Sequence, residues 1–255
     1  MNMIDSLSKL RMPGATLITR LRVYDTPSLD GQRGGTPHVH LVCSELYYVL
    51  SGTGAVEMID ASGFSRVELE AHSALLFSPG TIHRLINPHG DLELLVTMQN
   101  SGLPERGDNV VAFVDDVMAD DAAYHAAMRV TTLEEACRRR DRGVEGFLHL
   151  KAACERDPQA GREALAQFYG QAAARTAPLR REWGAVVRAG ALHEAETALA
   201  SLTALESGDT EYLHSAAHTL IHAAQPSKPG FCGHLNRYFD PATLNVIYTP
   251  EGTKA

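Results

Sequence analysis

The first hundred residues alternate between short apolar-rich runs and clusters of turn-forming residues, a pattern typical of an antiparallel barrel or sandwich. The runs have strand length, and Gly, Pro, Asn, Asp and Ser separate them. About eight strands are expected, which is the number that closes a small barrel around one ligand. They cover residues 15–24, 38–42, 45–50, 55–59, 65–70, 74–78, 83–86 and 92–99.

The composition changes between residues 101 and 121, where alternation gives way to Ala, Leu, Glu and Arg at helical spacing. We therefore expect an α+β protein with a small antiparallel β-barrel over residues 1–114 and an α-helical extension over residues 115–255. The extension should hold four or five helices between residues 122 and 224 and end in an irregular tail. Because apolar helix stripes have to be buried, these helices should form a bundle on the outside of the barrel.

Local signals predict where helices begin and which positions they bury. The expected helix starts are the Thr132–Glu135 capping box, the Asp157-Pro158 pair, and Asp209 or Thr210 at the head of a helix that runs to about Ala224. The expected buried stripe consists of Trp183, Val186, Val187, Leu192, Leu199, Leu202 and Leu205. The tail is rich in aromatic residues, so Phe231, Tyr238 and Phe239 should pack against the rest of the protein.

Composition and charge indicate a soluble protein without a polyanionic partner. A net charge of −8 argues against a nucleic-acid or anionic-membrane surface, and the short basic run 138–140 is expected to be a solvated helix end. No run approaches the ~20 apolar residues that span a bilayer, and residues 1–9 lack signal-peptide features, so a cytoplasmic location is expected. The four cysteines are scattered without a CxxC pair, which predicts reduced thiols rather than disulfides or a zinc knuckle.

The candidate chemistry lies in three histidines and one glutamate. His38 and His40 are two residues apart on a predicted strand and therefore point to the same face. Glu45 opens the next strand, and His83 follows a Pro-Gly turn that should start a strand on the opposite wall of the barrel. Three imidazoles and one carboxylate converging at ~2.0–2.3 Å could bind one divalent ion and leave positions open for water or substrate.

These residues and their spacing resemble the two characteristic motifs of the cupin superfamily, GX5HXHX4EX6G and GX5PXGX2HX3N. The match covers residues 34–87 and includes Gly52, Gly80 and Asn87. It departs from the motifs at Gln32 and His72, where the leading glycines would fall, and in the position of the proline before Gly80. The resemblance implies a jelly-roll barrel that holds one divalent metal ion (Fe, Mn, Ni or Zn) through His38, His40, Glu45 and His83. It also implies a homodimer, because such barrels often pair through outer strands.

Strand alternation from the four candidate ligands predicts the substrate pocket. The inner face should carry Val42, Tyr47, Val49, Leu75, Phe77 and Leu85. This pocket is apolar with one phenol and no lysine, which disfavours sugar-phosphate isomerisation. Arg20 and Arg22 share one face of the first strand; on the inner face they could hold a substrate carboxylate, and on the slightly favoured outer face they would pair with Glu or Asp. The candidate catalytic residues are therefore Tyr47, Arg20 and Arg22.

The resemblance alone does not fix the reaction, because cupin metals serve dioxygenases, isomerases, decarboxylases and lyases. A mixed His/Glu site in an apolar pocket suits iron or manganese that activates dioxygen on a small organic acid or aromatic compound, so a dioxygenase-type oxidoreductase is the leading interpretation. The alternatives are a non-catalytic ligand-binding or regulatory module and a cupin isomerase or lyase. A second histidine set, His214, His218 and His222, should be a solvated stripe, since no Asp, Glu or Cys completes it.

Overall fold

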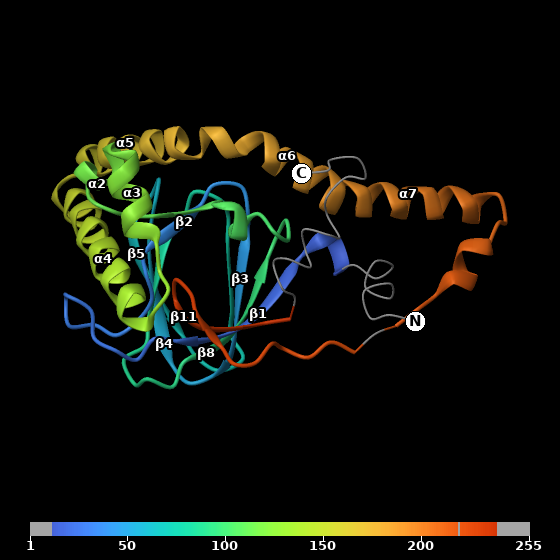
Figure 1. The fold of residues 1–255 in the computed structure, drawn as a ribbon, viewed down its shortest axis with the longest axis horizontal. Helices are drawn as coiled ribbons and strands as arrows, with labels where there is room; N and C mark the ends of the chain where they lie inside the picture. The colour runs from blue at the N-terminus through green and yellow to red at the C-terminus, as the bar shows by residue number, and fades with distance from the viewer. Residues whose placement is uncertain (1–11, 219, 239–255) are drawn as a thin grey trace.

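The structure, a computed structural model, describes residues 12–218 and 220–238. Antiparallel strands form two sheets around one core, with helices on the outside, which confirms the expected α+β fold (Figure 1). The strands are β1 (Leu17–Val23), β2 (His38–His40), β3 (Glu45–Ser51), β4 (Gly54–Asp60), β5 (Gly63–Leu69), β6 (Ala74–Phe77), β7 (Ile82–Ile86), β8 (Glu93–Met98), β9 (Asn109–Val111), β10 (Lys228–Pro229) and β11 (Gly233–Arg237). One sheet has the order β10-β11-β1-β8-β3-β6 and the other β5-β4-β7-β2-β9.

All eight predicted strands form, as β1 to β8. Three further strands were not predicted: β9, and the pair β10–β11 in the segment that the sequence presents as an irregular tail. Strand β11 pairs antiparallel with β1 in a register that places Thr19 opposite Arg237. The prediction of an irregular tail is therefore wrong for residues 228–237, which extend the edge of a barrel sheet.

Burial along the strands shows where the helices pack. Strand β1 alternates between buried and more exposed positions, because only its inner face is covered. Strand β7, in contrast, is buried at every position. Its outer face is covered by two long helices, so that Ile82 belongs to the same apolar cluster as Phe147 and Phe168 of the extension.

The helices of the extension are α2 (Asp115–Ala119), α3 (Asp121–Met128), α4 (Leu133–Arg156), α5 (Pro158–Thr176), α6 (Arg180–Val187) and α7 (His193–Glu206). Two predicted helix starts are confirmed. Thr132 accepts a hydrogen bond from the Glu135 amide while the Glu135 carboxylate accepts one from the Thr132 amide, and Asp157 caps α5 through the Ala160 amide. Helices α4 and α5 pack together on the five-stranded sheet, so the extension contributes a layer to the barrel wall (Figure 1).

Helices α6 and α7 leave this layer. A short π-helical segment, Arg188–Leu192, joins them, and α7 projects beyond the barrel (Figure 1). Trp183 and Val186 are buried as predicted, but Leu199 and Leu202 are 64% and 57% exposed, because the contacts of α7 with the 3-10 helix Pro13–Ala15 leave these side chains uncovered. The predicted buried stripe is therefore correct in α6 and wrong in α7, and the expected bundle is a layer with a projecting arm, defined here as residues 193–218.

The helix expected from residue 210 to Ala224 does not form. Glu211–Ser215 make a short 3-10 helix, and the described residues from 216 to 224 have no helical structure. Most side chains of this segment are exposed, and a helix of this length without a packing surface is marginal in water.

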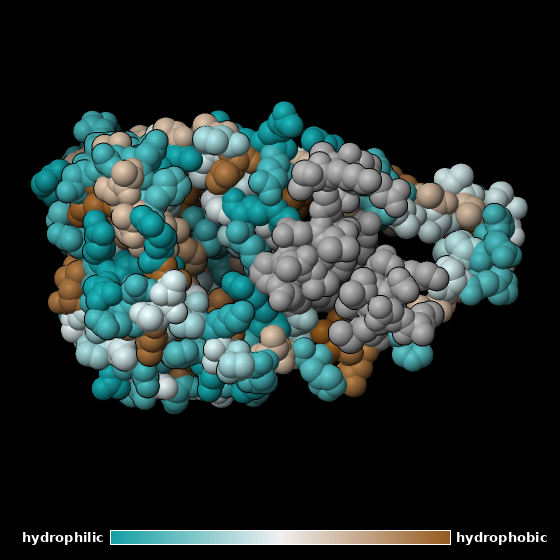
Figure 2. All heavy atoms as spheres, in the orientation of Figure 1, coloured by the Kyte–Doolittle hydropathy of each residue, from teal (hydrophilic) through white to brown (hydrophobic). Residues whose placement is uncertain are grey.

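Figure 2 shows polar side chains predominating on the visible face and the arm standing clear of the body. Within the described residues, no helix is long and apolar enough to cross a bilayer.

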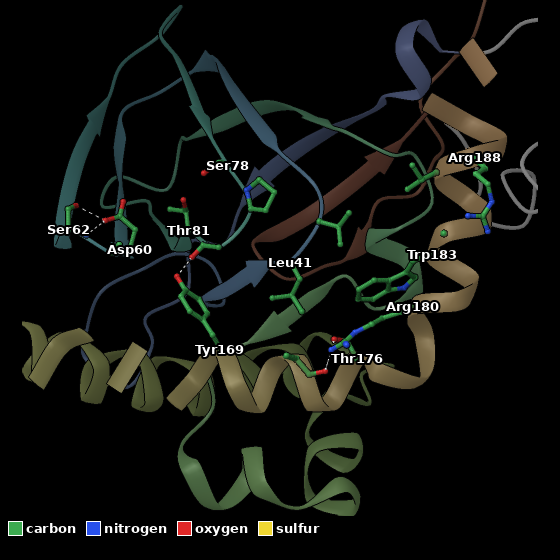
Figure 3. A pocket seen from close by; sticks show the side chains of 17 residues that line it. Leu41, Asp60, Ser62, Ser78, Thr81, Tyr169, Thr176, Arg180, Trp183 and Arg188 are labelled. Carbon is green, nitrogen blue, oxygen red and sulfur yellow. Dashed lines mark hydrogen bonds between the residues drawn. The ribbon is translucent and has the colours of Figure 1, made fainter. Parts of the chain in front are cut away.

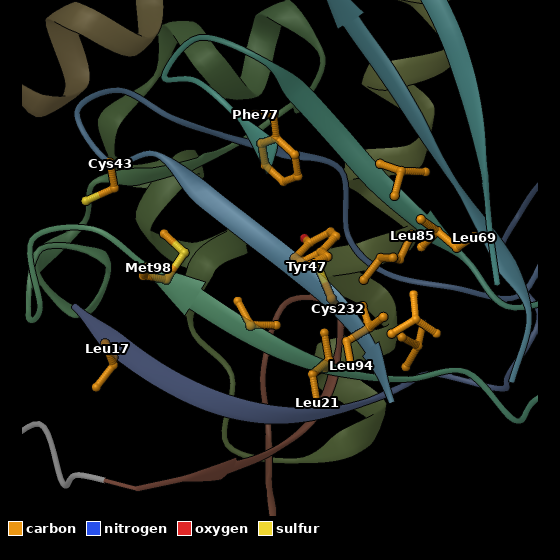
Figure 4. Close-up of a cluster of buried hydrophobic side chains, with 14 of the residues drawn as sticks. Leu17, Leu21, Cys43, Tyr47, Leu69, Phe77, Leu85, Leu94, Met98 and Cys232 are labelled. Carbon is orange, nitrogen blue, oxygen red and sulfur yellow. The ribbon is translucent and has the colours of Figure 1, made fainter. Parts of the chain in front are cut away.

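The barrel interior is filled by one apolar cluster with contributions from both sheets. Figure 4 shows its members around Tyr47 on β3, including Phe77, Leu85 and Leu94. Cys232 in the loop before β11 also belongs to this cluster, so the C-terminal segment adds to the core as well as to the sheet. All four cysteines are free thiols, with Cys43 and Cys232 buried.

Gly35 allows this C-terminal segment to pack closely. A Cβ at Gly35 would lie 2.8 Å from the Cys232 Cα and 3.0 Å from its Sγ. We expect Gly35→Ala to destabilise the protein by about 1–3 kcal/mol, because the added methyl group overpacks this contact. Amide hydrogen exchange should speed up most in residues 231–237.

Gly170→Ala is the matched control for this substitution. Gly170 lies within α5, and a Cβ there would meet no atom within 4 Å. Alanine should stabilise the helix by roughly 0.5–1 kcal/mol. Equal exchange protection of residues 231–237 in the two variants would show that Gly35 does not hold this segment.

Phe231 and Tyr238 both pack on the apolar clusters, as the tail prediction expected, whereas Phe239 lies outside the described residues.

Candidate metal centre

The four candidate ligands converge inside the barrel and are all buried. Their possible ligand atoms lie within 4.8 Å of one another, and no other such group of His, Cys, Asp or Glu occurs among the described residues. They are His38 and His40 on β2, Glu45 at the start of β3, and His83 on β7, and are named here the His–Glu cluster.

Strand pairing explains this convergence and corrects one expectation. Strand β2 pairs with β7 so that His38 lies directly opposite His83. The second motif is therefore not on the opposite wall, as expected from the sequence, but on the neighbouring strand of the same sheet. Glu45 is the residue that comes from the opposite sheet. The cluster thus spans the interior between the two sheets.

Backbone carbonyls orient two of the imidazoles. The Nδ1 of His38 lies 2.9 Å from the Thr36 carbonyl oxygen, and the Nδ1 of His83 lies 3.0 Å from that of Thr81. A carbonyl oxygen can only accept, so each Nδ1 carries the proton and each Nε2 keeps a free lone pair. This is the tautomer that a metal-binding histidine needs, with its second nitrogen held by a neighbouring group.

The donor atoms that face one another have no other partner. The Glu45 Oε2 lies 3.2 Å from the His83 Nε2 and 3.5 Å from the His40 Nε2. The Glu45 Oε2 and the His83 Nε2 are buried and accept or donate no hydrogen bond in the protein. Leaving such groups unpaired costs about 1–3 kcal/mol each, so the cluster fits a bound cation well. Ligands at about 2.0–2.2 Å from one ion are at most about 4.4 Å apart, which small side-chain movements would achieve.

Asp108 supports the cluster from behind, and the sequence analysis missed it. Its carboxylate is fully buried and accepts hydrogen bonds from the backbone amides of Leu41, Val42 and Cys43. The same carboxylate lies 3.4 Å from the His40 Nδ1, the nitrogen that points away from Glu45. Asp108 therefore fixes the loop after β2 and faces the His40 ring, the position that an outer-shell carboxylate takes at metal sites.

The pKa values of the two histidines on β2 shift in opposite directions. Burial, followed by the neighbouring His83 and His40, holds the pKa of His38 well below its usual range, so this ring stays neutral and able to bind a metal. Burial by itself would lower the pKa of His40, but Asp108 and Glu45 outweigh that effect and raise it. The carboxylates of Asp108 and Glu45 thus favour a positive charge at His40. A metal ion bound to the His40 Nε2 would supply that charge.

A cavity of about 230 Å³ opens beside the cluster. Its walls come from β1, β3 and β8, from the loop before β9, from the C-terminal segment, and from Arg139 of α4. The lining includes Tyr47, whose hydroxyl is buried without a hydrogen-bond partner, and Phe231, whose ring stacks on that of His38 with centroids 5.1 Å apart. Burial, then the charge of Glu45, raises the pKa of Tyr47, so its phenol stays protonated.

Only some of the predicted pocket residues line the cavity beside the His–Glu cluster. Tyr47 lines the cavity, whereas Val49, Phe77 and Leu85 belong to the buried apolar cluster, with Leu75 packed against it. These four residues share the interior but are not part of the cavity wall. Val42 is 38% exposed and lines a different cavity.

Arg20 and Arg22 are not brought to the cluster. Both are exposed on the outer face of β1, where Arg20 pairs with Glu93 and Arg22 donates a hydrogen bond to Ser227. The favoured outer-face alternative is therefore correct, because alternation along β1 places Thr19 and Leu21 inward. The second histidine set, His214, His218 and His222, is exposed and joins no ligand cluster.

A second, larger cavity of about 1110 Å³ lies between the barrel loops and helices α5 and α6. Figure 3 shows Tyr169, Arg180 and Trp183 on its helical side and Leu41 on its barrel side. The Tyr169 hydroxyl donates a hydrogen bond to the Gly80 carbonyl and ties α5 to the turn before β7. None of the four cluster residues lines this cavity, so it is separate from the candidate metal centre.

Comparisons with solved structures find only low overall similarity. A Klebsiella pneumoniae protein with a double-stranded β-helix domain is 15% identical, with a TM-score of 0.28, and the match covers 35% of this chain and 70% of that one. A nucleoside dehydratase of Streptomyces is 20% identical over 35% of this chain and 62% of its own, with a TM-score of 0.27. A TDP-fucose-3,4-ketoisomerase of Campylobacter jejuni is 16% identical over 33% and 58%, with a TM-score of 0.27.

The match to a family model is local. No curated protein matches the chain. The model of the cupin domain matches residues 28–98, a segment that contains all four residues of the His–Glu cluster and runs from before β2 to the end of β8. The helical layer and the C-terminal strands lie outside this segment. Residues 28–98 are thus similar to a cupin domain.

Proposed function

We propose that this protein is a metal-dependent enzyme that acts on a small organic molecule in the cavity beside the His–Glu cluster, with a dioxygenase-type reaction. The observation that carries the proposal is the convergence of four buried donors, among which the Glu45 Oε2 and the His83 Nε2 have no hydrogen-bond partner in the protein. A divalent ion held there supplies Lewis-acid chemistry and, if it is iron or manganese, redox chemistry.

The residues of the chain have separable roles in this proposal. His38, His40, Glu45 and His83 hold the ion. The protonated phenol of Tyr47 can donate a hydrogen bond to a substrate oxygen, because its hydroxyl is buried at the cavity wall without another partner. Leu21, Val96 and Met98 contribute apolar side chains to the cavity wall, which would reduce the hydration of a bound substrate. A mixed His/Glu donor set suits iron or manganese, which favours the oxidation of an organic substrate.

Oxygen consumption tests the type of reaction. The protein reconstituted with Fe(II) without air would be mixed with small aromatic and aliphatic acids and their neutral analogues, and oxygen uptake followed with an electrode. We expect at least one compound to be consumed together with dioxygen, and the His40→Ala variant to consume neither. Conversion of a compound without oxygen uptake would contradict the dioxygenase assignment and identify an isomerase or lyase.

A regulatory module is the second candidate, and one observation favours it. Helix α4 and the C-terminal strands both contribute to the cavity wall, so a bound ligand would contact the extension directly. Tight binding of a compound that is never converted, with changed hydrogen exchange in α4, would support this role and count against an enzyme.

A homodimer remains part of the proposal. Helix α7 exposes Leu199, Leu202 and Leu205, which is apolar surface that a second copy of the chain could cover. Light scattering should then give twice the chain mass of 27.6 kDa, and a monomer at high concentration would contradict it.

A further inference from the structure

Arg139 is a buried cation in the wall of the candidate active-site cavity. It belongs to α4 and is 8% exposed. One guanidinium nitrogen donates a 2.7 Å hydrogen bond to the Gly230 carbonyl, and the guanidinium carbon lies 4.2 Å from the centre of the Phe231 ring. The ring of His38 also stacks on Phe231, with centroids 5.1 Å apart, so Arg139 and the His–Glu cluster share this aromatic neighbour.

Two other arginines are even more buried, and both have carboxylate partners. Arg84 lies 2.9 Å from the Asp30 carboxylate, and Arg140 lies 3.0 Å from that of Asp141. Arg139 makes no ion pair with any residue that the structure describes, and its Nε is buried without a hydrogen-bond partner. The protein therefore neutralises two buried guanidinium groups internally and leaves a third, which lines the cavity, without a counter-charge.

This arrangement is costly unless an anion completes it. A buried charge without an opposite charge is strongly disfavoured, and burial does lower the pKa of Arg139. Glu105 lines the same cavity but faces Arg237 at 4.0 Å. A carboxylate matches the planar, bidentate donor geometry of a guanidinium.

We infer that the cavity binds a small carboxylic acid whose carboxylate pairs with Arg139 while the rest of the molecule faces the His–Glu cluster. The inference deepens the proposed function by naming the class of substrate, and it rests on that function only for the role of the metal. A cavity of about 230 Å³ equals roughly eight molecular volumes of liquid water, which suits an acid of about the size of benzoate.

A purely structural role for Arg139 makes a different prediction. As a clamp, Arg139 would only hold the C-terminal segment through the Gly230 carbonyl and the Phe231 ring. If Arg139 is only a clamp, its removal should loosen the cavity wall and weaken the binding of acids and of neutral amides equally. If Arg139 binds the anion, its removal should weaken the binding of acids only. The ratio of acid affinity to amide affinity therefore distinguishes the two roles.

The test uses calorimetric titration of the full chain with two matched pairs of probes, benzoate with benzamide and acetate with acetamide. Each pair is titrated into the zinc-reconstituted and the metal-free protein. The variant is Arg139→Gln, and the matched control is Arg138→Gln, because Arg138 is the neighbouring residue of α4 and is exposed beside Glu134. Arg139→Lys keeps the positive charge and should restore part of the preference for the acid.

We expect the wild type and Arg138→Gln to bind at least one acid more tightly than its amide, with and without zinc. In Arg139→Gln this preference should fall roughly 10- to 100-fold, which corresponds to the loss of a charge-assisted hydrogen bond, while amide binding changes little. An acid-to-amide ratio near one in the wild type for both pairs, or an unchanged ratio in Arg139→Gln, would overturn the inference. Failure of the wild type to take up zinc would instead count against the proposed function, since the Arg139-dependent preference is also measured without metal.

Discussion

Replacement of His40 by alanine is expected to abolish stoichiometric metal binding while leaving a folded barrel. His40 supplies one of four buried donors, and its loss removes a metal ligand directly. Metal affinity should fall by more than the roughly 10- to 100-fold that the loss of an outer-shell partner costs. Metal at about 100 times its Kd should stabilise the wild type by about 2.7 kcal/mol, or roughly 5–10 °C in Tm, and the variant not at all.

His89→Ala is the matched control, because His89 lies exposed in the loop after β7 and belongs to no ligand cluster. This control should keep both the metal and the metal-dependent rise in Tm. An unfolded His40→Ala chain in circular dichroism would show that the ion is structural. An undiminished metal content in that variant would remove His40 from the ligand set.

Replacement of Asp108 by asparagine should lower both stability and metal affinity. The carboxylate accepts three backbone hydrogen bonds at the loop after β2, and an amide of the same shape would turn one donor towards them. We expect a loss of about 1–3 kcal/mol in the free energy of unfolding and a roughly 10- to 100-fold weaker metal affinity. Urea unfolding of the metal-free protein and a metal competition titration measure the two effects separately.

Asp91→Asn controls for the change of charge, because Asp91 is exposed in the loop before β8. It should be close to the wild type in both measurements. Loss of stability with an unchanged metal affinity in Asp108→Asn would limit Asp108 to a role in the loop. Unchanged values in both measurements would contradict any support of the cluster by this residue.

The barrel and its ligands could be predicted because local rules determine them. Alternation along β2 places His38 and His40 on one face, and the turn residues between strands gave all eight strands of residues 15–99. Which wall carries His83 could not be predicted, because the pairing of β2 with β7 is a long-range contact. Strand β9 is only three residues long, which is too short to show the two-residue alternation of a strand. Asp108 directly precedes β9, so the sequence analysis missed this residue together with the strand.

The wall formed by the extension depends on tertiary packing that a sequence pattern does not show. The sequence predicts a solvated helix end for the basic run 138–140. The run instead lies within α4, where Arg138 is exposed and Arg139 and Arg140 are buried. Their surroundings come from residues about 90 to 115 positions away along the chain. The aromatic residues of the tail did signal packing, but the strand that carries them is visible only against β1.

Leu199 and Leu202 show the opposite error, because they are predicted to be buried and are exposed. Their helical spacing predicted burial, yet burial requires a partner surface, and α7 runs past the end of the barrel (Figure 1). An amphipathic pattern therefore predicts the helix more reliably than it predicts what the helix packs against. The same reasoning applies to residues 216–224, whose pattern fits a helix that does not form.

The metal content of the protein purified without added metal tests the central claim most directly. Elemental analysis by mass spectrometry, normalised to protein concentration, should find about one divalent ion per chain in the wild type and far less in His40→Ala purified in parallel. It should also find that the metal-free wild type takes up one equivalent again. A wild type that contains no ion, and that binds none when Fe(II), Mn(II), Ni(II) or Zn(II) is supplied, would contradict the assignment of the His–Glu cluster as a metal centre.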